Sequence, residues 1–435
     1  MKKRLSPYVI IPLSFVVINL IGTLILYLPI SHQETADVKF VDAFLLSTSA
    51  LTVTGLTSIM DISMTFNTFG KVVIAVLIQI GGLSVITIGV FLMILIGTKI
   101  NISNRLLIKE SMNQVSAKGA VKLVKNIVLI TLSIEFIGFV LNLFIFMSYY
   151  PFWEAVGYSA FHSISTFNNA GLDIFGSQNM IPFSGEIILL IISMIMIMIG
   201  GLGYVVIYDI LTKRRYKKLS IHSKIVLKVN LCLWLFGFVM FMIGQLQSNQ
   251  YTPLEAMFLS VSARTAGFKV TDMTSLSTLS IVVLVFLMFI GGSPSSTAGG
   301  IKTTSLYVIY KSIKGYAFGK KTITYNRYIA DESRYKVYIL VTSMLAIIFT
   351  SIVVILIIQP LSLEEVLVEA VSAITNTGLS MDTTQKLYST SKVIISLLML
   401  VGRVGPLTVL LIFNRNWPLK ESKHVKYLEE RIMIG

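Results

Sequence analysis

Four short strings of the chain each end in a glycine that follows small or polar residues, a pattern suited to holding a bare cation. They read TVTG, NNAG, RTAG and TNTG and end at Gly55, Gly171, Gly267 and Gly378. Glycine reaches backbone angles that other residues avoid and places no side chain between the backbone and an ion. Carbonyl oxygens of an extended string can then replace the hydration shell of a cation. The residues expected to line this ion site are Thr52, Val53, Thr54, Gly55, Asn168, Asn169, Ala170, Gly171, Arg264, Thr265, Ala266, Gly267, Thr375, Asn376, Thr377 and Gly378.

The elements around the strings repeat four times along the chain. Before each string lies a helix too short to cross a membrane, expected over 41–53, 154–167, 254–265 and 364–376. Each short helix follows a long apolar span, expected over 7–30, 124–149, 221–247 and 335–359. A second span with a glycine landmark follows each string, the landmarks being Gly81-Gly82, Gly200-Gly201, Gly291-Gly292 and Gly402. These landmarks follow the string glycines by 26, 29, 24 and 24 residues, a spacing that indicates four copies of one unit.

Composition places these units in a membrane. Of 435 residues, 54% are hydrophobic and only 13% charged, whereas a soluble protein carries roughly a quarter charged residues. The apolar stretches have the length of membrane helices, so eight spans are expected, the first of them uncleaved. One cysteine excludes a disulfide framework or a cysteine-based metal site.

The net charge of +15 is explained by topology rather than by nucleic acid. Lysines and arginines cluster near 99–125, 213–228 and 311–336 and at both termini, and acidic residues occupy the loops between. The positive-inside rule therefore predicts that both termini face the cytoplasm.

The predicted fold is an all-α polytopic membrane protein with four tandem units in pseudo-fourfold order about a central pore. The expected units are residues 1–98, 99–212, 213–320 and 321–413, followed by a cytoplasmic tail over 414–435. Extended backbone at membrane depth is tolerated where it is buried in protein or lines a watery cavity. Each short helix would point its partially negative C-terminal end at the centre, which favours a cation. The alternative is that each glycine only terminates a helix and the strings are ordinary loops.

The motifs TVTGL, NNAGL, RTAGF and NTGL resemble those of the Trk/Ktr/HKT potassium transport proteins over nearly the whole chain. The resemblance is greatest to the membrane subunit of bacterial Ktr systems, because the first pore span already begins by residue 7. It implies a membrane homodimer with one potassium pathway in each protomer, and a cytosolic nucleotide-binding ring of the RCK type on the inner face. It also implies that glycine at Gly55 favours potassium, whereas serine there accompanies sodium preference.

The segment IGGSPSSTAGGIKTT, residues 290–304, interrupts the second span of the third unit. Its glycines and proline remove helix propensity and a backbone donor. We expect it to obstruct the path below the strings as a gate, a role that the resemblance also implies; a simple kink is the alternative. Arg403, inside the last apolar span, is expected to add a positive barrier there, with structural pairing as the alternative. The gate residues are Gly291, Gly292, Ser293, Pro294, Ser295, Ser296, Thr297, Ala298, Gly299, Gly300, Lys302 and Arg403.

Other ionisable groups carry weaker expectations. Glu135 and Asp209 could serve a proton or sodium relay, although structural pairing is the better interpretation. The histidines have no metal-ligand spacing, and His162 is expected to pack or to form hydrogen bonds.

Two broad functions compete for the membrane protein. The first is channel-like potassium conduction, with sodium as a candidate activator, and the second is an alternating-access symporter coupled to Na⁺ or H⁺. Against the symporter stands the expectation that only one span is broken. A membrane enzyme is excluded by the lack of convergent catalytic groups. No dinucleotide motif occurs in the chain, so ATP or ADP is expected on the partner, docked on 99–125, 311–336 and 414–435.

Overall fold

The computed structural model describes residues 6–34, 36–96, 119–248 and 251–413, together with residues 100, 105, 107 and 108. The expected docking tail over 414–435 and most of the basic segment 99–118 lie outside these residues. In the described part the chain is helical, and its strands are one antiparallel pair, β1 (Ile323–Thr324) with β2 (Arg327–Tyr328). The all-α prediction is confirmed.

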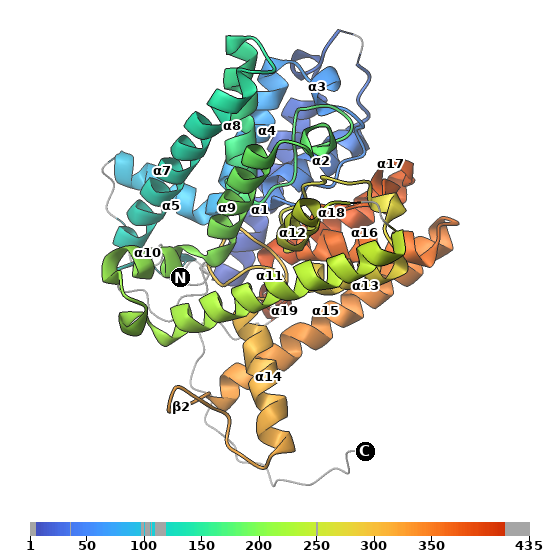
Figure 1. Ribbon diagram of the computed structural model, residues 1–435. Coiled ribbons are helices and arrows are strands. Elements are labelled where there is room, and N and C mark those ends of the chain that lie inside the picture. The colour runs from blue at the N-terminus through green and yellow to red at the C-terminus, as the bar shows by residue number, and fades with distance from the viewer. Residues whose placement is uncertain are drawn as a thin grey trace.

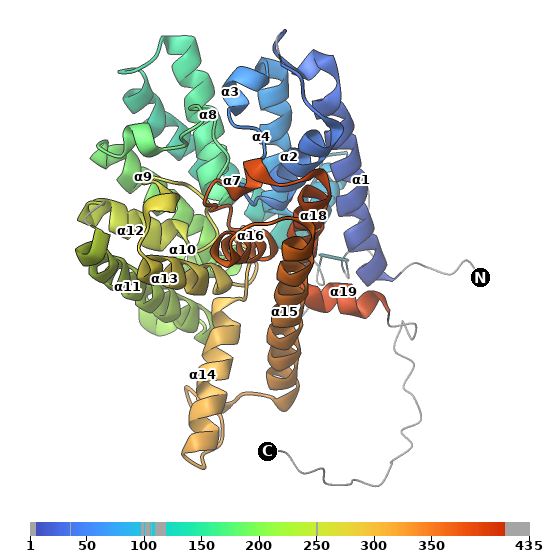
Figure 2. The same cartoon turned by 90° about the vertical axis from the view of Figure 1, so that its right-hand side faces the viewer.

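Four long helices and four short ones alternate as the sequence predicted. The long helices are α1 (Pro7–Tyr27), α7 (Ala120–Phe146), α11 (Ile221–Ser248) and α15 (Asp331–Ile358). These four are long and apolar enough to cross a membrane. The short helices that follow them are α2 (Phe40–Thr52), α8 (Phe152–Asn168), α12 (Pro253–Ser262) and α16 (Leu363–Thr375). Each short helix packs against the long helix before it, and Figure 2 shows α16 near the middle of the assembly.

Acidic residues begin the short helices as expected from the helix dipole. Asp42, Glu154, Glu255 and Glu365 all lie in the first turn of their helix. At α12 and α16 the acid also closes a capping box, with Thr252 and with Ser362 respectively. The opposite, C-terminal ends of these helices run directly into the strings.

The second helix of every unit is interrupted. The sequence had predicted eight spans and an interruption only in the third unit, so this prediction is corrected. In three units two helices meet at a bend of 95°, 98° and 93°: α4 (Thr68–Leu83) with α5 (Val85–Leu95), α9 (Ile187–Leu202) with α10 (Tyr204–Lys213), and α18 (Ser389–Val404) with α19 (Pro406–Ile412). Counting each bent pair once gives seven candidate spans among the described residues. In the third unit α13 (Thr278–Phe289) and α14 (Thr303–Ala317) are separated by residues 290–302, so the interruption expected over 290–304 ends two residues earlier.

The three bends share a backbone cause. Ser84, Gly203 and Gly405 connect the paired helices with φ of +72°, +90° and +92°, and each lies three residues after a landmark glycine. A positive φ ends a right-handed helix. Two of the three positions are glycine, but Ser84 gave no such signal, and the sequence reading missed all three bends.

The remaining elements are short. They are the helical turns η1 (Pro29–Ser31), α3 (Ile62–Thr65), η2 (Ile181–Phe183), η3 (Tyr216–Lys218), η4 (Met273–Ser275) and α17 (Thr383–Lys386). Beyond the main body, α14 and the start of α15 project side by side with the β1–β2 hairpin beside them (Figures 1 and 2).

Candidate ion pathway

The four strings adopt one backbone pattern. Val53, Asn169, Thr265 and Asn376 all have left-handed φ values between +49° and +67°, and each lies two residues before a string glycine. The glycines themselves have φ of +107°, +65°, +81° and +94° in chain order. The residue between is never left-handed. The same alternation of backbone handedness in all four strings indicates that they are copies of one local structure.

The string glycines meet in a ring that follows the chain order. A methyl group added to Gly55 would lie 3.2 Å from the Cα atoms of both Gly171 and Gly378. One added to Gly267 would lie 3.1 Å and 3.2 Å from the same two Cα atoms. The first and last units therefore close the ring, and the four bends face one another across a narrow opening.

Carbonyl oxygens lie between neighbouring glycines of the ring. The methyl group on each glycine would lie 2.1–2.8 Å from the carbonyl oxygen that precedes the next glycine, so a side chain at these positions would force the backbone to shift. The four oxygens belong to Ala170, Ala266, Thr377 and Thr54, opposite Gly55, Gly171, Gly267 and Gly378 respectively. A closed set of four peptide oxygens can replace water around an alkali cation.

Four buried serines brace the strings, and the sequence reading missed them. Ser49 and Ser372 accept hydrogen bonds on Oγ from the backbone N–H of Gly55 and Gly378, each at 2.9 Å. Ser165 and Ser262 instead donate to carbonyl oxygens just beyond their glycines, at 2.5 Å and 2.7 Å. The signal was present, because serine stands six residues before three of the glycines and five before the fourth.

Side chains of the strings mostly bond the protein rather than face an ion. Thr52 and Thr54 share a hydrogen bond of 2.7 Å, and Thr375 and Thr377 share another of the same length. Asn376 joins the last string to the first by donating to Thr54 Oγ1 at 3.0 Å. The backbone is thus held from behind by its own hydroxyl and amide groups.

Arg264 points away from the strings. Its guanidinium donates to Asn230 Oδ1 at 2.6 Å and to the Gly291 carbonyl oxygen at 2.7 Å, and the residue is only 4% exposed. Its side chain is therefore not an ion ligand, although the sequence placed Arg264 in the ion site. It ties the third string to the start of the 291–302 segment instead.

The landmark glycines lie under the ends of the short helices. A methyl group on Gly81, Gly200 or Gly402 would lie within 2.0 Å of the last carbonyl oxygens of the short helix in its own unit. Those oxygens belong to Leu51, Phe167 and Ile374. The repeated spacing noted in the sequence therefore reflects close backbone contact beneath three of the strings. In the third unit the landmark Gly291 lies against Gly299 instead.

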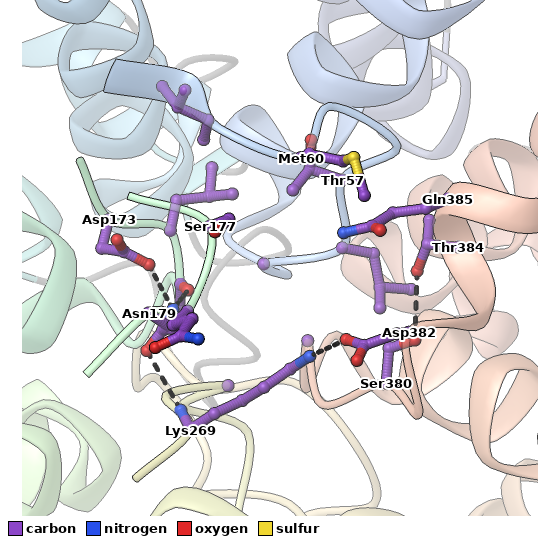
Figure 3. A pocket seen from close by; sticks show the side chains of 18 of the residues that line it. Thr57, Met60, Asp173, Ser177, Asn179, Lys269, Ser380, Asp382, Thr384 and Gln385 are labelled. Atoms are coloured by element: carbon purple, nitrogen blue, oxygen red, sulfur yellow. Dashed lines mark hydrogen bonds and ion pairs between the residues drawn. The ribbon is translucent and has the colours of Figure 1, made fainter. Parts of the chain in front are cut away.

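A polar cavity opens on one side of the ring. It has a volume of about 320 Å³ and is lined by the four string glycines and by loop residues that include Asp173, Lys269, Asp272 and Asp382. Figure 3 shows Lys269 reaching across this cavity to Asp382. The cavity therefore lies directly over the ring, because a residue of each of the four strings lines it.

The 291–302 segment lies on the other side of the strings. Thr297 donates from Oγ1 to the Phe167 carbonyl oxygen at 3.3 Å, and a methyl group on Gly299 would lie 2.1 Å from the Thr375 carbonyl oxygen. Backbone bonds from Ser293 N–H to the Gly201 oxygen, at 3.0 Å, and from Tyr204 N–H to the Ser295 oxygen, at 2.9 Å, attach it to the bend between α9 and α10. It therefore lies against the backbone at the start of the second and fourth strings.

Two cations hold this segment. Arg403 donates from Nη1 to the Thr297 oxygen and from Nη2 to the Gly81 oxygen. Lys302 donates from Nζ to the Ala298 oxygen at 2.7 Å. Arg403 thus reaches the segment from the fourth unit, as its position in the last span suggested.

The weaker candidates are satisfied structurally. Glu135 accepts from Asn168 Nδ2 at 2.8 Å and from Gln79 Nε2 at 3.1 Å, behind the second string. Asp209 pairs with Lys213 at 2.7 Å rather than with the arginines that follow it. His162 Nε2 lies 2.8 Å from Ser193 Oγ among aromatic rings, and among the described residues no group of three His, Cys, Asp or Glu could hold a metal.

Comparison with known proteins decides the family. A family model described as TrkH, cation transport protein, matches residues 5–425. The chain belongs to the TrkH family. It is therefore a multi-pass membrane transport protein and not an enzyme, and the resemblance read from its motifs is confirmed.

Relatives of this TrkH-family chain match over their full length. It is 33% identical to the Ktr system potassium uptake protein B of Bacillus subtilis, covering 99% of this chain and 97% of the relative. It is 32% identical to the potassium/sodium uptake protein NtpJ of Enterococcus hirae, covering 100% and 98%. The potassium transporter TrkH of Vibrio parahaemolyticus, a crystal structure, shares the fold at a TM-score of 0.73 and 18% identity, over 96% of this chain and 87% of that one.

Proposed function

We propose that this chain takes up potassium across the cytoplasmic membrane by conducting the ion through the ring of four strings. The observation that carries the proposal is the closed set of four carbonyl oxygens between Gly55, Gly171, Gly267 and Gly378. Relatives matched over the whole chain are named for potassium uptake, which supports the choice of ion. In this proposal the selectivity filter consists of the four strings, residues 52–55, 168–171, 264–267 and 375–378, with peptide oxygens as ligands and side chains as braces.

The 291–302 segment is the proposed gate. It fills the space beneath the filter and is held by hydrogen bonds that a small movement of α14 would break, including Lys302 to the Ala298 oxygen. Deleting residues 294–299 should raise rubidium flux, because the Thr297 and Gly299 contacts under the strings disappear. A well-folded deletion variant with unchanged flux contradicts the gate.

Control of the gate is assigned to a cytosolic nucleotide-binding subunit that carries ATP or ADP. Two matched relatives are named as parts of a Ktr system, which supports a multi-component assembly. The projecting α14–α15 pair, with Lys311, Lys314 and Lys336, provides a basic surface next to the gate. The proposal includes a membrane homodimer with both protein termini in the cytoplasm, and sodium as an activating ion.

An alternating-access symporter coupled to Na⁺ or H⁺ remains the second candidate. The three bent second helices favour it more than the sequence did, because broken helices are common in such transporters. The number of ions that one pore transports per second decides between the symporter and channel-like conduction. A flux well above about a thousand ions per second per pore exceeds the pace of conformational cycling.

The decisive experiment is rubidium and sodium uptake into vesicles that hold the purified chain, with and without its cytosolic partner. The matched variant is Gly55→Ser, whose side chain would enter the space next to the Ala170 oxygen. We expect rubidium to be preferred by the unmodified chain and the rubidium-to-sodium ratio to fall at least about tenfold in the variant. An unchanged ratio contradicts conduction through the strings.

A further inference from the structure

The residues two positions after the string glycines form a charged ring at the mouth of the filter. They are Thr57, Asp173, Lys269 and Ser380, and all four line the 320 Å³ cavity. The four positions are equivalent in the four units, yet one carries a carboxyl group and one an ammonium group. A lysine at the mouth of a cation pathway is unexpected, because its ammonium repels the ion.

The backbone of Lys269 is fixed at this mouth. Its N–H donates to Asn179 Oδ1 at 3.1 Å, and its carbonyl oxygen accepts from the Met180 N–H at 3.1 Å. The side chain therefore starts beside the third string, two residues from Gly267. From there a flexible four-carbon stem can carry the ammonium over the opening or away from it.

Asp382 decides where the ammonium lies. Lys269 Nζ donates to Asp382 Oδ1 at 2.7 Å, across the cavity from the third unit to the fourth (Figure 3). The lysine side chain is 21% exposed and the aspartate 50%, so the pair lies at the wet edge of the mouth. Asp173, although it occupies the equivalent position in the second unit, bonds Asn179 and the Phe175 N–H within its own loop.

Asp382 shows a second feature that supports this role. It occupies the N-cap position of α17, where aspartate normally accepts a backbone N–H of the helix. It makes no such bond, and its φ of +58° is left-handed. Its carboxylate is thus committed to Lys269 in place of the local helix.

We propose that Asp382 is a positioning residue that holds the Lys269 ammonium off the ion's line of approach. The proposal rests on conduction through the strings. Without the carboxylate, the ammonium is released into the mouth and lowers cation access. The pair is thereby an outer control on cation uptake, on the opposite side of the filter from the 291–302 segment.

The test is initial rubidium uptake into vesicles at low external rubidium. Asp382→Asn should lower the rate about tenfold, since one charge moves close to the path. Asp382→Glu should stay within about twofold of the unmodified chain because the carboxylate is kept. Lys269→Gln should be at least as fast as the unmodified chain, and Lys269→Gln combined with Asp382→Asn should match Lys269→Gln alone.

Asp272→Asn is the matched control. Asp272 lines the same cavity but bonds the Thr274 N–H at 2.9 Å, not Lys269. The Asp272→Asn variant loses the same charge as Asp382→Asn but leaves the Lys269–Asp382 pair intact. Its initial rate of rubidium uptake should therefore fall less than about twofold. Adding choline chloride outside should narrow the Asp382→Asn deficit, because salt screens a released charge.

The outcomes separate this proposal from the proposed function. A double variant as slow as Asp382→Asn, or equal losses in Asp382→Asn and Asp272→Asn, overturns the positioning role. In the same vesicles Gly55→Ser reports on the filter itself. If its rubidium-to-sodium ratio shifts as expected while the double variant fails to recover, the filter stands and the outer control is wrong.

Discussion

At the residue scale, the smallest unit of the proposed filter is a serine hydroxyl bonded to a glycine N–H. Ser372 Oγ accepts from Gly378 N at 2.9 Å, and both residues are buried in the protein. A buried N–H that loses its partner costs about 1–3 kcal/mol. The string can recover part of this only by moving the peptide group, which also moves the neighbouring carbonyl oxygens.

Ser372→Ala should therefore loosen selectivity before it abolishes transport. We expect the rubidium-to-sodium uptake ratio to fall about tenfold, the equivalent of about 1.4 kcal/mol. Ser391→Ala is the control, because Ser391 is equally buried in α18 but its Oγ has no hydrogen-bond partner among the described residues. Equal ratios in the two variants would show that the serine brace does not set selectivity.

Asp173 is expected to give the mouth of the proposed filter a pH dependence. Burial raises the pKa of the Asp173 carboxyl to about 7. This net value includes smaller effects on the pKa: the Phe175 N–H and the Lys269 ammonium lower it, and the nearby Asp61 raises it. The carboxyl is therefore neutral in acid and becomes an anion as external pH rises through about 7, so its attraction for cations appears on the alkaline side.

Rubidium uptake at low external rubidium should thus rise about two- to threefold between external pH of about 6 and about 8. Asp173→Asn should flatten this rise, while Asp272→Asn, in the same cavity, should keep it. A rise of the same size in Asp173→Asn would mean that another group is titrating.

Sequence reasoning reached the residue scale only partly. The string glycines were predicted because glycine at four equivalent positions indicates a backbone conformation that other residues avoid. The sequence predicted Arg264 as a string residue but not the direction of its side chain, whose partners Asn230 and Gly291 lie 34 and 27 residues away. The Lys269–Asp382 pair joins residues 113 apart and was invisible for the same reason.

At the element scale, the short helices were predictable and the bends were not. Each short helix is marked by length and by an acidic first turn, both of which are local signals. The bends after α4, α9 and α18 interrupt stretches that are apolar on both sides, so hydropathy continues straight through them. What distinguishes a bend from a continuous span is the positive φ of one residue, Ser84, Gly203 or Gly405, and hydropathy does not report it.

Gly405→Ala tests whether that single residue sets the bend. A methyl group there would have space, its nearest neighbour being Thr408 Oγ1 at 3.9 Å, so any loss comes from the φ of +92°. We expect a loss of about 2 kcal/mol in the free energy of unfolding. The measurement is thermal unfolding of the detergent-solubilised protein.

Gly89→Ala provides the comparison. Gly89 lies within α5 and an added methyl group would meet nothing within 4 Å. Alanine there should be neutral or stabilising by up to about 1 kcal/mol, because it favours the helix. Equal melting temperatures for the two variants would refute the strained bend.

At the scale of the whole molecule, the chain closes a ring in which the first unit meets the last. Lys392 in α18 pairs with Asp42 in α2 at 2.6 Å, and Asn376 bonds Thr54 across the same boundary. The spacing of the strings predicted four units but not how they close. Closure depends on contacts between residues 350 and 322 positions apart, which no local pattern encodes.

Arg403 spans this ring from beneath. It belongs to the fourth unit, and it bonds the Thr297 oxygen of the third unit and the Gly81 oxygen of the first. Hydrogen bonds from a charged donor contribute about 1.5–3 kcal/mol each. The same side chain therefore stabilises the folded ring and holds the proposed gate in place.

These two roles predict opposite signs in one variant. Arg403→Gln should lower the melting temperature and at the same time raise partner-free rubidium flux at least about fivefold, because both the charge and the hold on Thr297 are lost. Arg403→Lys keeps the charge but cannot bond both oxygens with the same geometry. Its flux should therefore be intermediate between that of the unmodified chain and that of Arg403→Gln. A loss of stability without any gain of flux in Arg403→Gln would make Arg403 a structural link only, and would leave the barrier under the filter to the 291–302 backbone.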